Sequence, residues 1–401
     1  MLTHRSRPFV LAISLGAAAL AACGGRDAVE VEGDQTLPSA EELERQRLDG
    51  GWREVVTLDS AVIADSARSP EQWNQIAPDV VNRAPQYLPL SGDVAGPSVL
   101  RVQILLDRAL FSPGAIDGRW GQNTEKALYW LQRRERLPAT ARVDSATFAR
   151  LAALAGAPRS LVRRHTLTDA DVAGPFLELP PSDSVYARAE LPCTCYESLS
   201  EKLSELFHVT PEILRQLNPG VALDRLRRGE SLWVPDVRPP ARIDTTATRV
   251  ATTVAPAVAR LVVSDRGRYL HALDAEGRLL YHFPSTLGSS YEPSPDGAFT
   301  VERIAYDPDW HFQPRLLARV DDWRRETVVP GGPNNAVGSV WMALSKPHYG
   351  IHGTSAPETI GYASSAGCVR LTNWDALFLS TQIAPGVPVE FRDRGDVAPG
   401  A

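Results

Sequence analysis

The feature that most constrains the fold of this chain is a succession of short apolar runs that begins at residue 260. The runs at 261–263, 269–273 and 279–284 are separated by Asp-Arg-Gly and Glu-Gly turns, which is typical of a β meander. Further candidate strands lie at 299–304, 339–344, 349–352 and 387–391, and a helix is expected at about 373–381. The pattern predicts a mainly-β domain over residues 258–393.

Two loops of this β-rich region carry one histidine and one cysteine, each next to a glycine. The loops read Tyr349-Gly350-Ile351-His352-Gly353-Thr354 and Ser364-Ser365-Ala366-Gly367-Cys368-Val369-Arg370-Leu371. A thiol attacks as thiolate, and an imidazole within hydrogen-bond reach can take its proton near neutral pH. Taken alone, Cys368 could equally be a small buried apolar residue, but its context favours catalysis.

These residues resemble the L,D-transpeptidase (YkuD or ErfK) family, whose pattern is roughly His-Gly-Thr, a short loop, and Ser-His-Gly-Cys-(Ile/Val)-Arg. The segments 294–299 and 332–338 also look like two turns of that family. One departure is Ala366, which stands where the family usually has a second histidine. The resemblance implies a mainly-β catalytic sandwich in which the earlier histidine, here His352, is the general base.

The resemblance also implies roles for the other motif residues. Cys368 would be the nucleophile, and backbone NH groups around Ala366 and Gly367 would form an oxyanion hole, with Gly353 shaping the loop. Arg370 would bind a substrate carboxylate, although a structural salt bridge is an alternative. Ser365 would hold the loop or contact substrate. No cofactor and no metal site are expected.

The amino terminus has the pattern of an export signal. Arg5 and Arg7 precede an apolar run at 9–22, which is too short to span a bilayer as a mature helix. The run ends in Leu20-Ala21-Ala22-Cys23, which resembles a bacterial lipobox, so residues 1–23 are interpreted as a lipoprotein signal peptide with Cys23 as the lipidated residue. An ordinary signal peptide is the alternative. The expected location is the cell envelope, on the periplasmic side and outer-membrane anchored in a Gram-negative source.

The net charge bears on the class of partner, and the two remaining cysteines bear on disulfide formation. The formal net charge of −6 argues against nucleic acid as a partner, since that role usually needs a basic face. Cys193 and Cys195 could form a local disulfide in an oxidising envelope or remain two thiols. The membrane is therefore expected as a partner only through the lipid anchor.

The chain is expected to be multidomain. Residues 24–89 are rich in acidic residues, Ser and Pro and predict a tether, and the Pro- and Thr-rich segment 237–257 predicts a linker. Residues 190–236 resemble a LysM-like α+β module, in which Thr210 and Pro211 begin a helix and His208 is a packing or capping residue. Residues 90–156 resemble a three-helix peptidoglycan-binding module, on the basis of Leu105, Ile116, Asp117, Gly118, Gly121, Thr124, Ala127, Leu131, Gln132, Val143, Asp144, Thr147 and Leu151.

Three functions are compatible with this organisation. The first is an envelope L,D-transpeptidase that acts on peptidoglycan stem peptides and glycan to form cross-links or attach proteins during cell wall remodelling. The second uses the same site with water as acceptor, as an L,D-carboxypeptidase or cross-link hydrolase. The third is a catalytically silent lipoprotein that binds peptidoglycan. Because Cys368 and His352 are both present, the third function is the least favoured of the three.

Overall fold

The computed structural model describes residues 73–156, 160–237, 258–289, 291–317, 320–321 and 323–392. The predicted signal peptide, Cys23 and most of the predicted tether and linker lie outside these residues. Within the described part of the chain, no helix has both the length and the apolar character needed to cross a bilayer.

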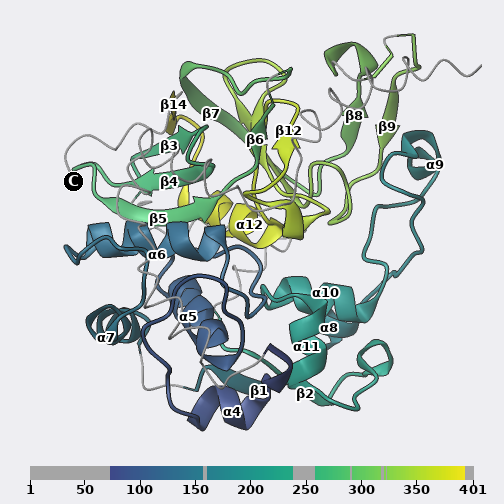
Figure 1. Cartoon of the computed structure of the whole chain (residues 1–401). Helices are drawn as coiled ribbons and strands as arrows, with labels where there is room; N and C mark the ends of the chain where they lie inside the picture. The colour runs from purple at the N-terminus through teal and green to yellow at the C-terminus, as the bar shows by residue number, and fades with distance from the viewer. Residues whose placement is uncertain are drawn as a thin grey trace, which may run out of the picture.

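The C-terminal region forms one curled sheet of eight strands in the order β13-β11-β10-β7-β14-β3-β4-β5 (Figure 1). The mainly-β fold class is therefore confirmed, and the expected strands lie within two residues of their predicted ends. The strands are β3 (Arg260–Ser264), β4 (Tyr269–Leu273), β5 (Leu279–Pro284), β7 (Gly297–Tyr306), β10 (Val340–Leu344), β11 (Gly350–His352), β13 (Val369–Arg370) and β14 (Pro388–Arg392).

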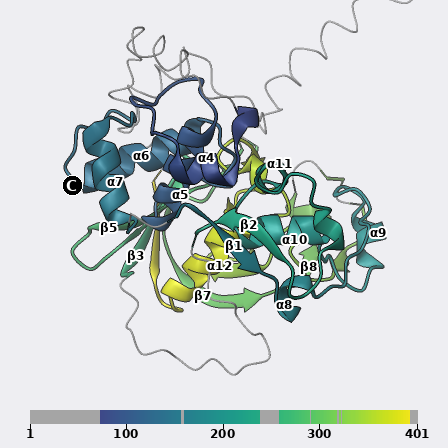
Figure 2. The same ribbon diagram turned by 90° about the horizontal axis from the view of Figure 1, so that it is seen from below.

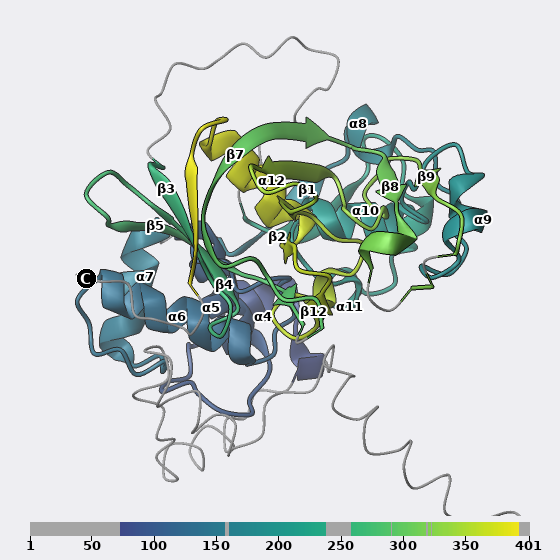
Figure 3. The same ribbon diagram turned by 90° about the horizontal axis from the view of Figure 1, so that it is seen from above.

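The long strand β7 joins the two halves of the sheet. Its first part pairs with β14 and its second part with β10, and Figure 3 shows it curving over the molecule. Helix α12 (Asn373–Gln382) follows the cysteine motif, as predicted, and buries Ala376 and Leu379 against the sheet. The apolar residues of strands and helix therefore form one core, which holds the motif loops at the edge of the sheet.

Several short strands were not predicted, among them β13. Strands β6 (Leu287–Gly288) and β12 (Ser364–Ser365) pair with each other, as do β8 (Trp310–Phe312) and β9 (Thr327–Val329). The β8–β9 hairpin packs against α9 (Val185–Ala189) through a small apolar cluster. Strands of two or three residues are too short to show a period in the sequence.

The predicted helical module is confirmed as three helices, α5 (Pro97–Arg108), α6 (Gln122–Arg134) and α7 (Ser145–Leu154). Gln103 holds the turn between the first two, because its amide donates to Asp117 Oδ1 at 2.8 Å and accepts from the Gly118 amide at 2.8 Å. Thr124, one of the residues that match the module, lies inside α6, and its hydroxyl accepts from Gln103 at 3.2 Å.

A second unit, here called the βααβ unit (residues 160–237), is built on the antiparallel pair β1 (Val162–Thr166) and β2 (Ser231–Pro235). Helices α10 (Leu199–Leu206) and α11 (Pro211–Leu217) lie between the strands, and Thr210 caps α11 as predicted. The first strand lies upstream of residue 190, where the LysM-like module was expected to begin. The strand order is compatible with a LysM-like module, which remains a prediction.

Residues 73–89, assigned to the tether by their composition, are folded. Helix α4 (Pro78–Arg83) buries Val81, and Ile76 just before it joins the same apolar core as the βααβ unit. Arg101 of α5 donates to the carbonyl oxygens of Val80 at 2.6 Å and Val81 at 2.7 Å. These contacts correct the predicted end of the tether, because two buried apolar residues and one arginine are enough to fix a short segment.

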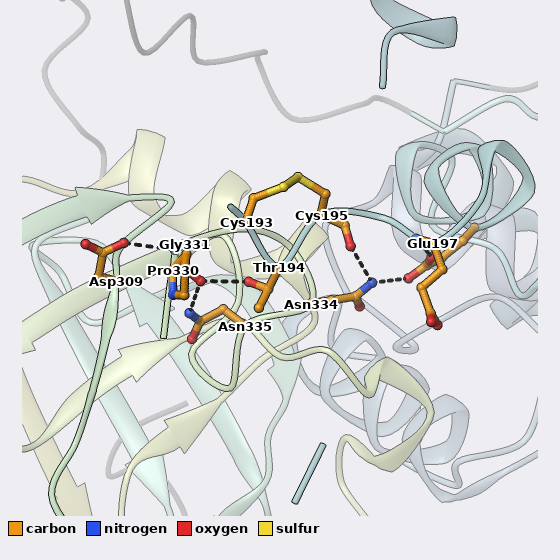
Figure 4. The surroundings of a disulfide bond; sticks show 10 residues. Cys193, Thr194, Cys195, Glu197, Asp309, Pro330, Gly331, Asn334 and Asn335 are labelled. Atoms are coloured by element: carbon orange, nitrogen blue, oxygen red, sulfur yellow. Dashed lines mark hydrogen bonds between the residues drawn. A yellow bond between two sulfur atoms is a disulfide. The ribbon is translucent and has the colours of Figure 1, made fainter. Parts of the chain in front are cut away.

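Cys193 and Cys195 form a disulfide, which settles the alternative left open by their spacing (Figure 4). The backbone of Thr194 between them accepts from the Asn334 amide at 3.0 Å and donates to Gly331 at 3.1 Å. Gly332 makes this approach possible, since a Cβ there would lie 2.4 Å from the Thr194 carbonyl oxygen. The disulfide loop is thus docked on the loop that precedes β10.

The first turn of α12 is the meeting point of all three units. The helical module and the βααβ unit lie side by side beneath the sheet, with α12 facing them (Figure 1 and Figure 2). Asp375 accepts from Ser112 of the helical module at 2.9 Å, and Trp374 stacks on His208 of the βααβ unit with ring centroids 5.0 Å apart. His208 in turn contacts Asp107 of α5 at 2.7 Å, so it is a packing residue, as predicted.

We expect Gly332→Ala to lower the free energy of unfolding by roughly 1 to 3 kcal/mol, because the new methyl group meets the Thr194 carbonyl and φ is +145°. Gly229→Ala is the matched control, since Gly229 also has a positive φ but a Cβ added there would have no heavy atom within 4 Å. Chemical denaturation measures both. Equal losses would contradict the docking of the disulfide loop as a stabilising contact.

Candidate active site

The strand register brings the two motif loops together. Strands β11 and β13 are parallel neighbours, and His352 pairs directly with Arg370. Cys368 precedes Arg370 by two positions, in the bend that leads into β13. The register therefore places the histidine and the arginine on one face at the edge of the sheet, with the cysteine in the segment directly before β13.

That face opens on a cavity of about 670 Å³. One wall comes from β7, β10 and the motif loops, and the other from β8 and the turn that follows it. His352, Cys368, Arg370, Ser365 and Ala366, all of them predicted site residues, line it. The further lining residues are Arg303, Ala305, Pro308, Asp309, Trp310, His311, Gln313, Leu316, Leu317, Ala336, Val337, Trp341, Pro347, His348 and Tyr349.

His352 is buried and held in one tautomer. Its Nδ1 lies 2.7 Å from the Gly353 carbonyl oxygen, which can only accept, so Nδ1 carries the proton and Nε2 keeps the lone pair. Trp341 stacks on the imidazole with ring centroids 5.4 Å apart. Burial and the charge of Arg370 lower the pKa of His352 to about 3, although backbone carbonyls of Gly353 and Val337 act in the opposite direction.

Cys368 is a free, half-buried cysteine that lines the same cavity. Its Sγ lies 3.7 Å from the carbonyl oxygen of His348, a residue with φ of +69°. Burial raises the pKa of the thiol, and a backbone hydrogen bond from Gly350 and the charge of Arg370 oppose this only in part. At rest the cavity is therefore lined by a neutral thiol and a neutral imidazole, and not by the ionised thiolate that the motif alone suggested.

Arg370 lies close enough to both groups to influence their pKa values. Its Nε is buried without a hydrogen-bond partner, and it forms no salt bridge to any described residue. Burial lowers the pKa of the guanidinium, and the neighbouring Glu292 and Cys368 counteract this. The structural salt bridge that was the alternative for this arginine is absent from the described residues.

The small residues of the motif shape the loops. Gly367 has a φ of +95°, and its amide donates to Ser365 Oγ at 3.2 Å, while the Ser365 hydroxyl donates to the Cys368 carbonyl at 2.6 Å. Gly353 donates its amide to Val340 at 3.2 Å. Because both glycine amides are engaged, the amides of Ala366 and Cys368 are the remaining candidates for an oxyanion hole.

Sequence reasoning missed most of the cavity wall. Arg303 and Ala305 come from β7, and Trp310, His311 and Gln313 come from β8 and its turn. These positions carry no recognisable motif. Their place in the cavity wall could be predicted only if the pairing of β7 with β10 were known. Trp341 of β10 also lines the cavity. Among the described residues, no group of three or more His, Cys, Asp or Glu side chains could hold a metal ion.

Two protein families match parts of this chain. Residues 259–391 match the YkuD family, described as the L,D-transpeptidase catalytic domain. Residues 95–151 match a family described as "Putative peptidoglycan binding domain". A Bacillus licheniformis protein named "Putative L,D-transpeptidase YkuD" is 32% identical over 189 residues, which are 47% of this chain and 90% of that protein. The chain belongs to the YkuD family of L,D-transpeptidases.

Other relatives match over a smaller share of the chain. The Escherichia coli protein named "Probable L,D-transpeptidase YbiS" is 34% identical over 132 residues, covering 30% of this chain and 43% of that protein. The crystal structure of L,D-transpeptidase 3 from Mycobacterium tuberculosis is similar at 18% sequence identity with a TM-score of 0.29. That similarity covers 34% of this chain and 61% of the other.

The lowered pKa of His352 can be tested directly. Because the imidazole is neutral down to a pH of about 3, its ring resonances should not move between pH 8 and pH 5 in an NMR titration. The loss of one set of resonances in His352→Gln assigns them. A titration midpoint near the ordinary value of 6.5 would contradict the neutral resting pair.

Proposed function

We propose that this chain is a peptidoglycan L,D-transpeptidase that works through a cysteine acyl-enzyme. The observation that carries the proposal is that Cys368, Arg370 and His352 line one cavity, with His352 and Arg370 paired on neighbouring strands. The family membership supports an enzyme of this kind. The substrate class follows from the family and from the peptidoglycan-binding module on the same chain.

In the acylation step, Cys368 Sγ attacks the carbonyl carbon of the stem peptide bond that precedes a terminal D-alanine. His352 Nε2 takes the thiol proton during the attack, since neither group is ionised at rest. The tetrahedral intermediate collapses, its C–N bond breaks, and His352 returns the proton to the leaving amine. The products are a thioester on Cys368 and free D-alanine.

In the second step, an acceptor amine attacks the thioester carbon. Its proton passes to His352 and then to the departing sulfur, so the amide forms as the thioester breaks and the enzyme returns to its starting state. An amine from a neighbouring stem gives a cross-link, and an amine from a protein gives attachment to the wall. Water in the same place gives L,D-carboxypeptidase activity, which is the second candidate function.

Arg370 suits substrate binding in this scheme. A buried guanidinium nitrogen without a partner costs free energy, and a substrate carboxylate would satisfy it with two parallel hydrogen bonds. Ser365 lines the cavity beside it and supports the loop. The proposal also includes export, lipid attachment at Cys23 and a place in the periplasm, with the two upstream units directing the catalytic domain to the polymer.

Product analysis tests the proposal. Purified protein incubated with tetrapeptide-bearing disaccharides should yield a dimer with loss of D-alanine by mass spectrometry, and Cys368→Ala should yield none. His352→Ala should slow the reaction roughly 10²- to 10⁴-fold. A tripeptide product alone would favour hydrolysis, and the absence of any Cys368-dependent product would leave the silent peptidoglycan-binding lipoprotein.

A further inference from the structure

Asn373, the first residue of α12, links the chain segments of the two reactive residues. It follows Cys368 by five positions and is completely buried. Its Oδ1 accepts from the backbone amides of Ser339 at 3.0 Å and Thr354 at 3.1 Å. Ser339 leads directly into β10, and Thr354 follows His352 by two positions, so one side chain holds the histidine end of the β10–β11 pair next to the cysteine segment.

The surroundings of Asn373 Oδ1 favour a single orientation of the side-chain amide. A Cβ on Gly353 would lie 2.0 Å from Asn373 Oδ1, and one on Gly338 would lie 2.1 Å from it. If the side-chain amide were turned over, Nδ2 would face two backbone N–H donors and no acceptor. The position of the histidine loop therefore depends on which way the Asn373 amide points.

The other end of the amide is held partly from outside the family's catalytic domain. Asn373 Nδ2 donates to both carboxylate oxygens of Glu205, at 3.0 Å and 3.1 Å, and to the Pro333 carbonyl at 3.1 Å. Glu205 belongs to α10 of the βααβ unit, and the Tyr196 hydroxyl donates to it at 2.8 Å. A carboxylate offers only acceptors, so it favours the orientation in which Nδ2 points toward it.

We propose that Glu205 is a positioning residue for the acyl transfer, acting through Asn373 to fix the His352 loop against the Cys368 segment. This inference rests on the proposed function. Glu205 does not line the cavity and needs no contact with substrate. We expect Glu205 to affect the rate of the chemical step, because a displacement of the base by about 1 Å can lower that rate 10²-fold.

The test is a set of full-length variants whose Cys368 is acylated by a carbapenem, followed by mass spectrometry over a range of concentrations at pH 8. Burial raises the pKa of Glu205 to about 7, so its carboxylate is mostly ionised at that pH. We expect Glu205→Ala to lower the limiting rate about tenfold or more, with little change in the concentration that gives half of it. Glu205→Gln keeps an acceptor for Asn373 and should retain most of the rate.

A rescue separates positioning from general loss of structure. Asn373→Asp keeps the acceptor for Ser339 and Thr354 but places a second carboxylate against Glu205, so it should be slow. Adding Glu205→Gln supplies an N–H donor to that carboxylate and should restore the rate. Glu212→Ala, an exposed glutamate of the neighbouring helix α11, is the matched control and should behave as the wild type.

The outcomes are distinct. Wild-type protein that is not acylated at Cys368 would overturn the proposed function and this inference with it. Wild-type acylation with an unchanged rate in Glu205→Ala, or with no recovery in the double variant, would overturn the inference alone. Thermal unfolding of each variant identifies any that lose rate only because they are unfolded.

Discussion

The buried hydrogen bonds of the first turn of α12 are the constraint on which the rest of the structure depends. Asn373 contacts Glu205, Trp374 stacks on His208, and Asp375 accepts from Ser112, so three consecutive residues reach both upstream units. A buried polar group that loses its partner costs roughly 1 to 3 kcal/mol. Moving either unit away would leave such groups unpaired beside the cysteine motif, and the arrangement is therefore held by the need to satisfy them.

The same burial determines the protonation of the site. His352 is stacked on Trp341 and lies near Arg370, and both dehydration and like charge disfavour an imidazolium there. An ion pair with Cys368 is consequently not the resting state. In the proposed mechanism, the neutral thiol is unreactive until a carbonyl carbon is in place, when attack and proton transfer occur together. The chemistry then depends on the geometry of the two loops more than on a preformed thiolate.

Local patterns were sufficient for much of the fold and for part of the site. The strands from 260 onward have turn residues between them, and α5, α7 and α12 show caps or apolar periods that read clearly in the chain. The strands β6, β8, β9 and β12 are too short for this, and the cavity wall that β8 supplies was missed with them. Glu205 could not be found from sequence, because its importance lies in a contact with a residue 168 positions away. The burial of Ile76 and Val81 could not be predicted, because the segment around them is polar in composition.

The candidate site is supported by residues outside the catalytic domain that family similarity defines. The loop before β10 contributes Ala336 and Val337 to the cavity, and its outer side is held by residues of the βααβ unit. The backbone of Thr194 bonds to Gly331 and Asn334, and the side-chain amide of Asn334 donates to Glu201 at 2.7 Å. The same side-chain amide donates to the Cys195 carbonyl at 3.1 Å (Figure 4). Glu205 acts a few residues further along the same helix. The βααβ unit is therefore connected by hydrogen bonds both to the loop that lines the cavity and, through Asn373, to the His352 loop.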